Sequence, residues 1–192
     1  MSEAPPPWPK HGSRAGVDYR IFRVRHDELE NPRTGARMER VVCETPPWVN
    51  VIALTAEREL VMVHQYRFGI GRNSLEIPGG MVDPGEEHGA AARRELLEET
   101  GYEAETWTYL GHVEPNPALQ DNLCHHWLAE GARASASPTP DPGEDLRVVT
   151  LSLEEVRRRI HAGEIAHSLV LTALSRVIDL RTHAHHVPNL GD

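Results

Sequence analysis

The stretch Gly80–Tyr102 reads GMVDPGEEHGAAARRELLEETGY and concentrates glutamates at helical spacing. Offsets of three and four residues place Glu95, Glu98 and Glu99 within about 100° of arc on one face of a helix. Like charges at this spacing repel each other and destabilise an isolated helix. A hard divalent cation would neutralise them, and ligation by oxygen alone suits Mg²⁺ or Mn²⁺ better than Zn²⁺. We therefore predict a metal site on this helix.

The flanks of the stretch predict a loop, a helix and a second loop. The segment Asp83–Gly85 has the composition of a turn, and Gly101 follows the last helical turn as a left-handed stop. Glu86 and Glu87 lie where the helix begins and favour its positive end. A run such as RRELLEET is also typical of a solvated helix face with neighbouring charge pairs. The spacing of the whole segment has to decide between the two interpretations.

That spacing resembles the Nudix box, whose nine set positions all fit. They are Gly80, five residues, Glu86, seven residues, Arg94-Glu95-Leu96, one residue, Glu98-Glu99, one residue, and Gly101-Tyr102. Tyr102 stands where an aliphatic residue is more usual. The resemblance implies a Nudix hydrolase, an enzyme that cleaves a pyrophosphate bond in a nucleoside diphosphate linked to a further group.

The resemblance also assigns roles to residues of the box. The metal ligands would be the carbonyl oxygen of Gly80 and the carboxylates of Glu95, Glu98 and Glu99. Arg94 would pair with the carboxylate of Glu86 and fix the loop to the helix, so we expect these two residues to support the site.

Upstream of the box, the segments Leu60–Arg67 (LVMVHQYR) and Leu75–Gly80 (LEIPGG) resemble ADP-ribose pyrophosphatases and nucleoside-diphosphate-sugar hydrolases. The resemblance implies that Arg67 contacts the substrate diphosphate, which suits a bidentate guanidinium. Glu76 is a charged residue in an apolar strand and is either paired with Arg67 or directed at the site. Trp48 would stack on a base, or belong to the core or an interface.

Pro117 lies close to where ADP-ribose pyrophosphatases carry a distinguishing proline, and relatives often have a catalytic glutamate after it. Here Asn122 stands in that loop and cannot accept a proton as a carboxylate would. We therefore prefer Glu144, in a later loop, as the general base, with the box glutamates Glu98 and Glu99 as the other catalytic candidates.

The resemblance implies metal-dependent hydrolysis of ADP-ribose or a related nucleoside diphosphate sugar, which gives a nucleoside monophosphate and a sugar phosphate. One alternative is a hydrolase of GDP-mannose-type sugar nucleotides, or a housecleaning nucleoside triphosphatase. A second alternative is a Nudix module that senses a nucleotide without cleaving it, since a fold does not fix a function.

Composition bounds the remaining possibilities. A chain of 192 residues with a net charge of −9 predicts one domain and argues against nucleic acid as the main partner. No apolar run approaches the ~18 residues of a membrane span and no signal-peptide pattern is present, so we expect a cytoplasmic protein without membrane contacts. Cys43 and Cys124 have no metal-ligand spacing and are expected to be reduced thiols.

The order of patterns predicts an α+β fold, and the resemblance implies the Nudix α/β/α sandwich with a mixed sheet. Residues 1–16 are predicted to be a flexible arm, 17–182 a single domain and 183–192 a tail. Residues 17–45 would form an antiparallel hairpin, from strands 19–24 and 38–43, that the resemblance implies to be the interface of a homodimer. Further strands are expected at 49–54, 60–66, 106–113, 123–129 and 146–151, with helices at 153–161 and 164–178 and a loop at 131–143.

Overall fold

The computed structural model describes residues 4–181, and its contacts divide the chain into two compact units. The smaller unit comprises the chain up to Pro47 together with Val113–Cys124, and the larger comprises Trp48–His112 and the chain from His125. The single domain over residues 17–182 stays a prediction. The tail predicted at 183–192 lies outside the described residues.

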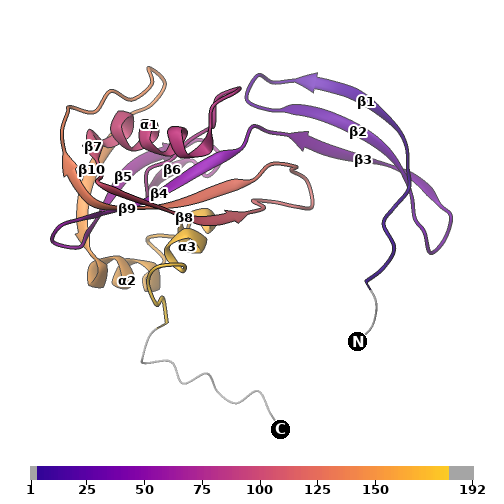
Figure 1. Ribbon diagram of the computed structural model, residues 1–192. Helices are drawn as coiled ribbons and strands as arrows, with labels where there is room; N and C mark the ends of the chain where they lie inside the picture. Colours follow the sequence, from indigo (N-terminus) through magenta and orange to yellow (C-terminus); the bar gives the residue numbers. More distant parts are fainter. Residues whose placement is uncertain (1–3, 182–192) are drawn as a thin grey trace, which may run out of the picture. The chain divides into compact units, whose positions relative to one another are not determined.

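The larger unit is a sheet between helices (Figure 1). Its strands run in the order β10-β5-β4-β9-β7, with β6 paired to β5 and β8 paired to β9. They are β4 (Trp48–Thr55), β5 (Glu59–Arg67), β6 (Arg72–Glu76), β7 (Tyr102–Glu103), β8 (Thr106–Val113), β9 (Cys124–Ala134) and β10 (Leu146–Ser152). Helix α1 (His88–Thr100) covers one face, while α2 (Leu153–His161) and α3 (Ser168–Leu174) cover the other. The predicted α/β/α sandwich is confirmed.

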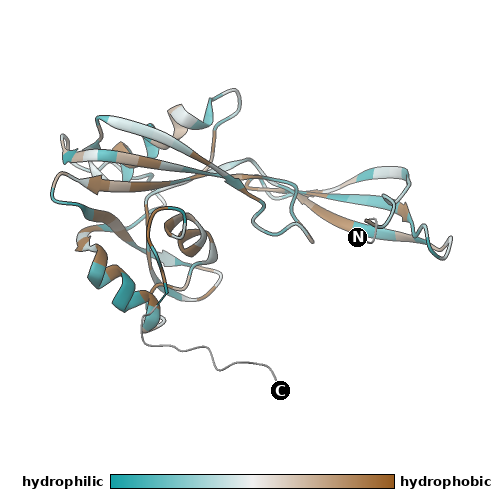
Figure 2. Ribbon diagram, turned by 60° about the horizontal axis from the view of Figure 1, so that its bottom comes forward, coloured by the Kyte–Doolittle hydropathy of each residue, from teal (hydrophilic) through white to brown (hydrophobic). Residues whose placement is uncertain are grey.

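Two apolar clusters, one on each face, hold the layers together. On the face under α1, which we call the α1 face, Val51 and Val61 pack with Leu96 of the helix. On the α2–α3 face, Leu60 and Met62 pack with Leu174. Figure 2 shows brown, apolar segments concentrated in the strands that the helices cover. Burial of apolar side chains on both faces explains why these strands read as nearly continuous hydrophobic runs.

Strand β5 alternates between the two faces, because successive side chains of a strand point in opposite directions. Val61 belongs to the α1-face cluster and Met62 to the other, so Gln65 and Arg67 lie on the α1 face. The same alternation places His64 and Tyr66 on the α2–α3 face. Antiparallel ladders fix this register on both edges, with seven residue pairs to β10 and five to β6.

The smaller unit is a three-stranded antiparallel sheet of β1 (Lys10–Asp18), β2 (Arg23–Glu30) and β3 (Arg37–Glu44). The flexible arm predicted for residues 1–16 is therefore wrong from Lys10 onward. The strand predicted at 19–24 is shifted, because residues 19–22 connect β1 to β2. The returning strand at 38–43 is confirmed.

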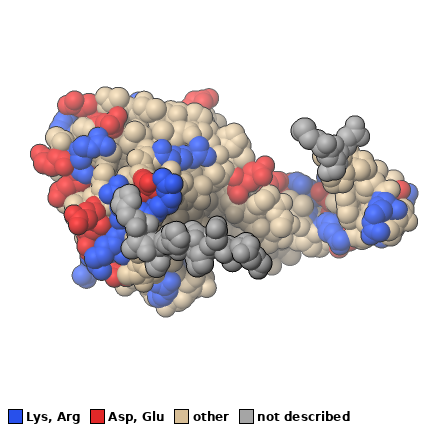
Figure 3. Space-filling model, turned by 90° about the horizontal axis from the view of Figure 1, so that it is seen from below, with Lys and Arg blue, Asp and Glu red and all other residues tan. Residues whose placement is uncertain are grey.

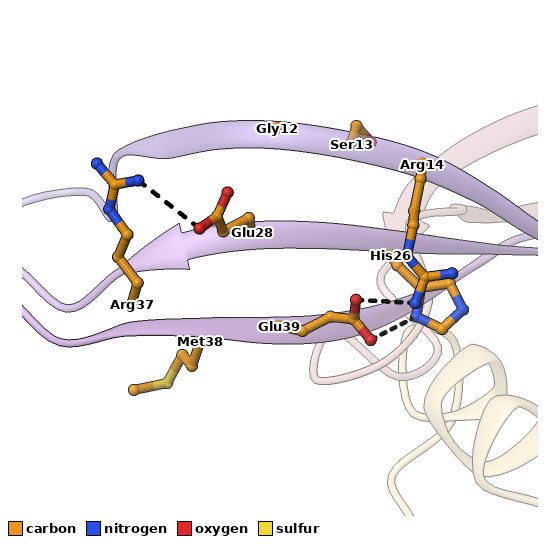
Figure 4. A pocket seen from close by; sticks show the side chains of 8 residues that line it. All are labelled: Gly12, Ser13, Arg14, His26, Glu28, Arg37, Met38 and Glu39. Carbon is orange, nitrogen blue, oxygen red and sulfur yellow. Dashed lines mark hydrogen bonds and ion pairs between the residues drawn. The ribbon is translucent and has the colours of Figure 1, made fainter.

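Ion pairs and hydrogen bonds between polar side chains connect β1 to β2 and β3. Because these side chains are polar, the sequence of β1 shows no hydrophobic periodicity. Lys10 and Ser13 contact the carboxylate of Asp27 at 2.8 Å and 2.5 Å. Arg14 contacts Glu39 across the sheet at 2.8 Å, as Figure 4 shows. Opposite charges on facing strands stabilise a sheet in the way apolar pairs do, although each pair contributes only about 0.2–1 kcal/mol.

The remaining boundaries follow the predictions with two exceptions. Strand β9 continues to Ala134, so the predicted loop at 131–143 begins later, and α3 is shorter than the predicted helix at 164–178. Helix α2 matches its prediction, and the Ser152 side chain accepts a hydrogen bond from the Glu155 N–H as its N-cap. Cys43 is half-buried and Cys124 is buried. Within residues 4–181, no helix is long and apolar enough to cross a membrane.

Candidate active site

Helix α1 lies between the two loops that the sequence predicted. The turn before it is closed by a 2.9 Å hydrogen bond from the Glu86 N–H to the Asp83 carbonyl. The helix ends at Gly101, which has a φ of 72° and donates its N–H to the Leu97 carbonyl. A side chain at this φ would be strained, so glycine terminates the helix at this point.

The glycine pair Gly79-Gly80 brings the backbone against both β4 and α1. A Cβ atom on Gly79 would lie 2.1 Å from the Val49 carbonyl oxygen, and one on Gly80 would lie 2.5 Å from Glu95 Oε1. The Gly80 carbonyl accepts a hydrogen bond of 2.9 Å from the Val49 N–H. A carbonyl oxygen has a second lone pair, and the role of this one as a metal ligand stays a prediction.

Arg94 is the central cation of the site. It makes two hydrogen bonds to Glu86, of 3.0 and 2.9 Å, and one of 3.0 Å to the Met81 carbonyl. Its Nη1 atom contacts Glu95 at 2.8 Å and Glu98 at 3.1 Å. The predicted pair of Arg94 and Glu86 is thus present. It holds the pKa of the Glu86 carboxyl below its usual value and raises the pKa of Arg94.

Glu99 of the helix is buried and Glu95 is partly buried, and both have raised pKa values. Burial raises the pKa of Glu95 to about 7, with contributions from Glu98 and Glu144 against the opposing effect of Arg94. Burial raises the pKa of Glu99 to about 8, although the Gly79 N–H donates a 3.0 Å hydrogen bond to its carboxylate. These carboxylates are close enough to repel each other, as the helical spacing predicted.

Arg67 and Glu76 form a bidentate ion pair on the α1 face. Glu76 is buried, and its oxygens accept hydrogen bonds of 2.9 and 2.7 Å from Nε and Nη2 of Arg67. Burial alone would raise the pKa of Glu76, but Arg67 reverses the effect and leaves it lowered. The sequence left open whether Glu76 is paired with Arg67, and the structure shows that it is. The pair leaves Nη1 of Arg67 available for a ligand.

Glu144 lies in the exposed loop before β10, on the same side of the sheet as the box glutamates. Its Oε1 accepts a 3.4 Å hydrogen bond from Gln65, and its charge acts on Glu95, Glu99 and Arg67. The sequence analysis did not select Gln65 as a site residue. The alternation of β5, which puts Gln65 beside Arg67, was the signal that could have found it.

Trp48 and Asn122, the two remaining residues of the sequence analysis, both contact other parts of the protein. Trp48 starts β4 and is bridged to Met81, next to Gly80, where its ring is half-buried. Asn122 is buried and donates a hydrogen bond of 3.0 Å to the Pro46 carbonyl within the smaller unit. The roles of Trp48 and of this loop in the reaction stay predictions.

The donor set fits a hard cation, although the ligands do not yet converge on one. Within residues 4–181, no group of three His, Cys, Asp or Glu side chains is arranged to hold a metal ion. The Nη1 atom of Arg94 contacts the carboxylates of both Glu95 and Glu98. Buried carboxylates with raised pKa values gain from a divalent cation, because it offsets both their burial and their repulsion.

Comparisons with known proteins concern the family and the fold. A family model described as "NUDIX domain" matches residues 44–171. The chain is 33% identical to the ADP-ribose pyrophosphatase of Mycobacterium tuberculosis, over 82% of this chain and 76% of that protein. It is also 33% identical to the methanol dehydrogenase activator of Bacillus methanolicus, over 81% and 84%. A crystal structure of an ADP compounds hydrolase superposes with a TM-score of 0.79 at 22% identity, covering 92% and 95% of the two chains, and supports the fold.

Proposed function

The chain belongs to the Nudix family, and from this we propose that it hydrolyses the pyrophosphate bond of ADP-ribose or a related nucleoside diphosphate sugar. The products would be a nucleoside monophosphate and a sugar phosphate, AMP and ribose 5-phosphate for ADP-ribose. The observation that carries this proposal is the arrangement on the α1 face, where Glu95, Glu99 and Glu144 act on one another beside Arg67. Relatives named as pyrophosphatases of ADP-ribose and of ADP-sugars support the substrate class.

Binding of the substrate needs positive charge, since both phosphates are anionic. We assign the diphosphate contact to Arg67, whose guanidinium is oriented by the two hydrogen bonds to Glu76. Glu95, Glu98 and Glu99 with the Gly80 carbonyl would hold Mg²⁺ or Mn²⁺. When bound, such an ion spreads the phosphate charge and lowers the pKa of water.

The protein then has to orient the attacking water and take its proton. Glu144 is the proposed base, with its carboxylate positioned by the amide of Gln65. Water attacks one phosphorus atom, the bridging P–O bond breaks, and the leaving phosphate keeps the electron pair. Glu99 is the other candidate for the base, because it lies beside Glu95, Glu144 and Arg67.

A panel of substrates with Mg²⁺ tests this proposal. ADP-ribose, GDP-mannose, UDP-glucose and dGTP are offered to the protein and to a Glu98→Gln variant, and the products are identified by mass. We expect AMP from ADP-ribose and at least 10²-fold less of it from the variant. The matched control is Glu87→Gln, which removes an exposed carboxylate without a side-chain cap bond next to the same helix. Pyrophosphate from dGTP as the main product would replace the proposal with a triphosphatase.

A second candidate is a module that acts on a partner enzyme. It is favoured by the relative named as a methanol dehydrogenase activator, at 33% identity over most of both chains. Retention of nucleotide binding without release of AMP from any substrate of the panel would favour this candidate.

We also propose that two copies associate through the sheet of β1, β2 and β3, as the resemblance implied. Val17, Ile21 and Val41 are apolar side chains of this unit that are more than 40% exposed, which suits a covered surface. A monomer mass at micromolar concentration by light scattering would exclude the dimer. The cytoplasmic location stays a prediction.

A further inference from the structure

The larger unit has a second polar pocket, on the face of the sheet opposite the proposed active site. It is a cavity of about 410 Å³ lined by His64 of β5, Asn73 of β6, and Asp145 and Arg147 at the start of β10. His64 pairs in register with Arg147 on one side and with the core residue Leu75 on the other. Directly opposed residues share a face, so the pocket lies on the α2–α3 face.

The polar groups of this pocket are available to a ligand. Among residues 4–181, the side chains of His64, Asn73, Asp145 and Arg147 make no hydrogen bond or ion pair. This contrasts with Arg67 and Glu76, which satisfy each other on the other face of the same strands. A positive and a negative group that line one cavity without pairing offer separate anchors to a molecule bound between them.

An aromatic pair continues the pocket along the same face. Tyr66 is the next residue after His64 on this face of β5 and is opposed by Asn73. Its ring contacts that of Phe68 edge to face, with 5.6 Å between the centroids. The two side chains are 48% and 85% exposed, which is unusual for large apolar rings. Such rings bind planar bases by stacking.

We propose that this pocket binds a nucleoside monophosphate. Arg147 would hold the phosphate, and His64 would add a donor. Asp145 would accept hydrogen bonds from the ribose hydroxyls, as carboxylates do in other nucleotide sites. Asn73 has the amide that pairs with the N6 and N7 edge of adenine, and Tyr66 would stack on the ring.

The charge of the pocket selects the monophosphate. A single arginine next to an aspartate gives no net positive charge, so the pocket does not match a diphosphate or triphosphate, which need several cations. Figure 3 shows the same balance on the α2 and α3 side of the larger unit, where basic and acidic side chains are interspersed. AMP is also a product of the proposed reaction, and this part of the inference rests on the proposed function.

Calorimetric titration with AMP tests the site. The proposed active site binds AMP as a product, so the wild-type protein should bind two equivalents per chain. Arg147→Ala should bind one, and should hydrolyse ADP-ribose as the wild type does. The matched control is Arg133→Ala, an exposed arginine on β9, which should still bind two. Tyr66→Ala should weaken the second site at least fivefold.

Three results would overturn the inference. One is equal AMP stoichiometry in the wild type and Arg147→Ala. Another is binding of inorganic phosphate as tight as that of AMP, which would leave no role for the ribose or the ring. The third is photo-crosslinking of 8-azido-AMP to peptides of the α1 face alone, whereas we expect a crosslink to Tyr66 or Phe68 as well. Because the readout is binding, failure of the proposed hydrolysis would be recognised separately, in the activity assay.

Discussion

Gly80→Ala should impair activity while leaving the fold intact. A Cβ atom at this position would lie 2.5 Å from Glu95 Oε1 and 2.6 Å from its Cδ, where ordinary contact begins at 3.4 Å. The carboxylate therefore has to retreat by about 1 Å. Glu95 is the end of a flexible side chain, so the cost in folding free energy is on the order of 1 kcal/mol. A displacement of about 1 Å at a reacting centre lowers the rate by about 10²-fold, or about 2.7 kcal/mol.

The assay is kcat/KM for ADP-ribose over a titration of Mg²⁺, together with a thermal melt. Two glycines provide the comparison. Gly79→Ala would place Cβ 2.1 Å from the backbone oxygen of Val49, so it should reduce stability severely. Gly12→Ala meets nothing closer than Glu28 at 3.8 Å and should change neither activity nor stability. If Gly80→Ala kept wild-type kcat/KM and metal dependence, then the contact of Gly80 with Glu95 would not set the position of the carboxylate.

Three further predictions concern the general base, the pH dependence of stability and the role of Arg94 as the cation beside the glutamates. Glu144→Gln should lower kcat by about 10²-fold or more with little change in KM, and a drop below threefold in steady-state rates would return the role of base to Glu99. Burial lowers the pKa of His126 from 6.5 to about 4, so the unfolded chain takes up a proton first as the pH falls. Stability should be full above pH 6.5 and fall on the order of 3 kcal/mol towards pH 4. Urea unfolding should show that the free energy of unfolding of His126→Leu depends less on pH than that of the wild type. Parallel pH profiles for the two proteins would contradict this prediction. Chelation of divalent metal should shift the melting temperature by only a few degrees, because Arg94 already neutralises Glu95 and Glu98. Calorimetry should show that Arg94→Gln destabilises the metal-free protein by about 3 kcal/mol. A large loss of stability on chelation alone would show that Arg94 does not neutralise these carboxylates.

The sequence predicted those parts of the fold whose signals are local. Gly101 ends α1 because glycine adopts its φ of 72° at no steric cost, and Ser152 caps α2 because its side chain reaches the Glu155 N–H. Apolar runs identified β4 and β5 because both faces of those strands are buried. The two consecutive histidines of β9 point to opposite faces, because the side chains of a strand alternate. His126 is fully buried, while His125 stacks on His88 with 4.1 Å between the ring centroids.

The sequence did not predict polar pairs between residues that lie far apart along the chain. Strand β1 has no apolar alternation, and its partners Asp27 and Glu39 lie 14 and 25 residues from Ser13 and Arg14. No local pattern reveals such a strand, which is why it was predicted to be an arm. The candidate site shows the same limit. The spacing of the box placed the glutamates on one helix face, but it could not show that Arg94 would contact Glu95 and Glu98 as well as Glu86.

The alternation of β5 has a consequence for how this family can change in length. Arg67 and His64 are three positions apart and therefore lie on opposite faces, so an insertion or deletion of one residue between Leu60 and His64 would exchange their faces. Such a change would turn the arginine away from the glutamates of α1 and would expose core side chains to water. The hairpin tip at residues 68–71 lies beyond both ladders. We therefore expect natural length variation in this part of the molecule to be confined to the tip, and circular permutation or loop grafting to be tolerated there rather than within the strand.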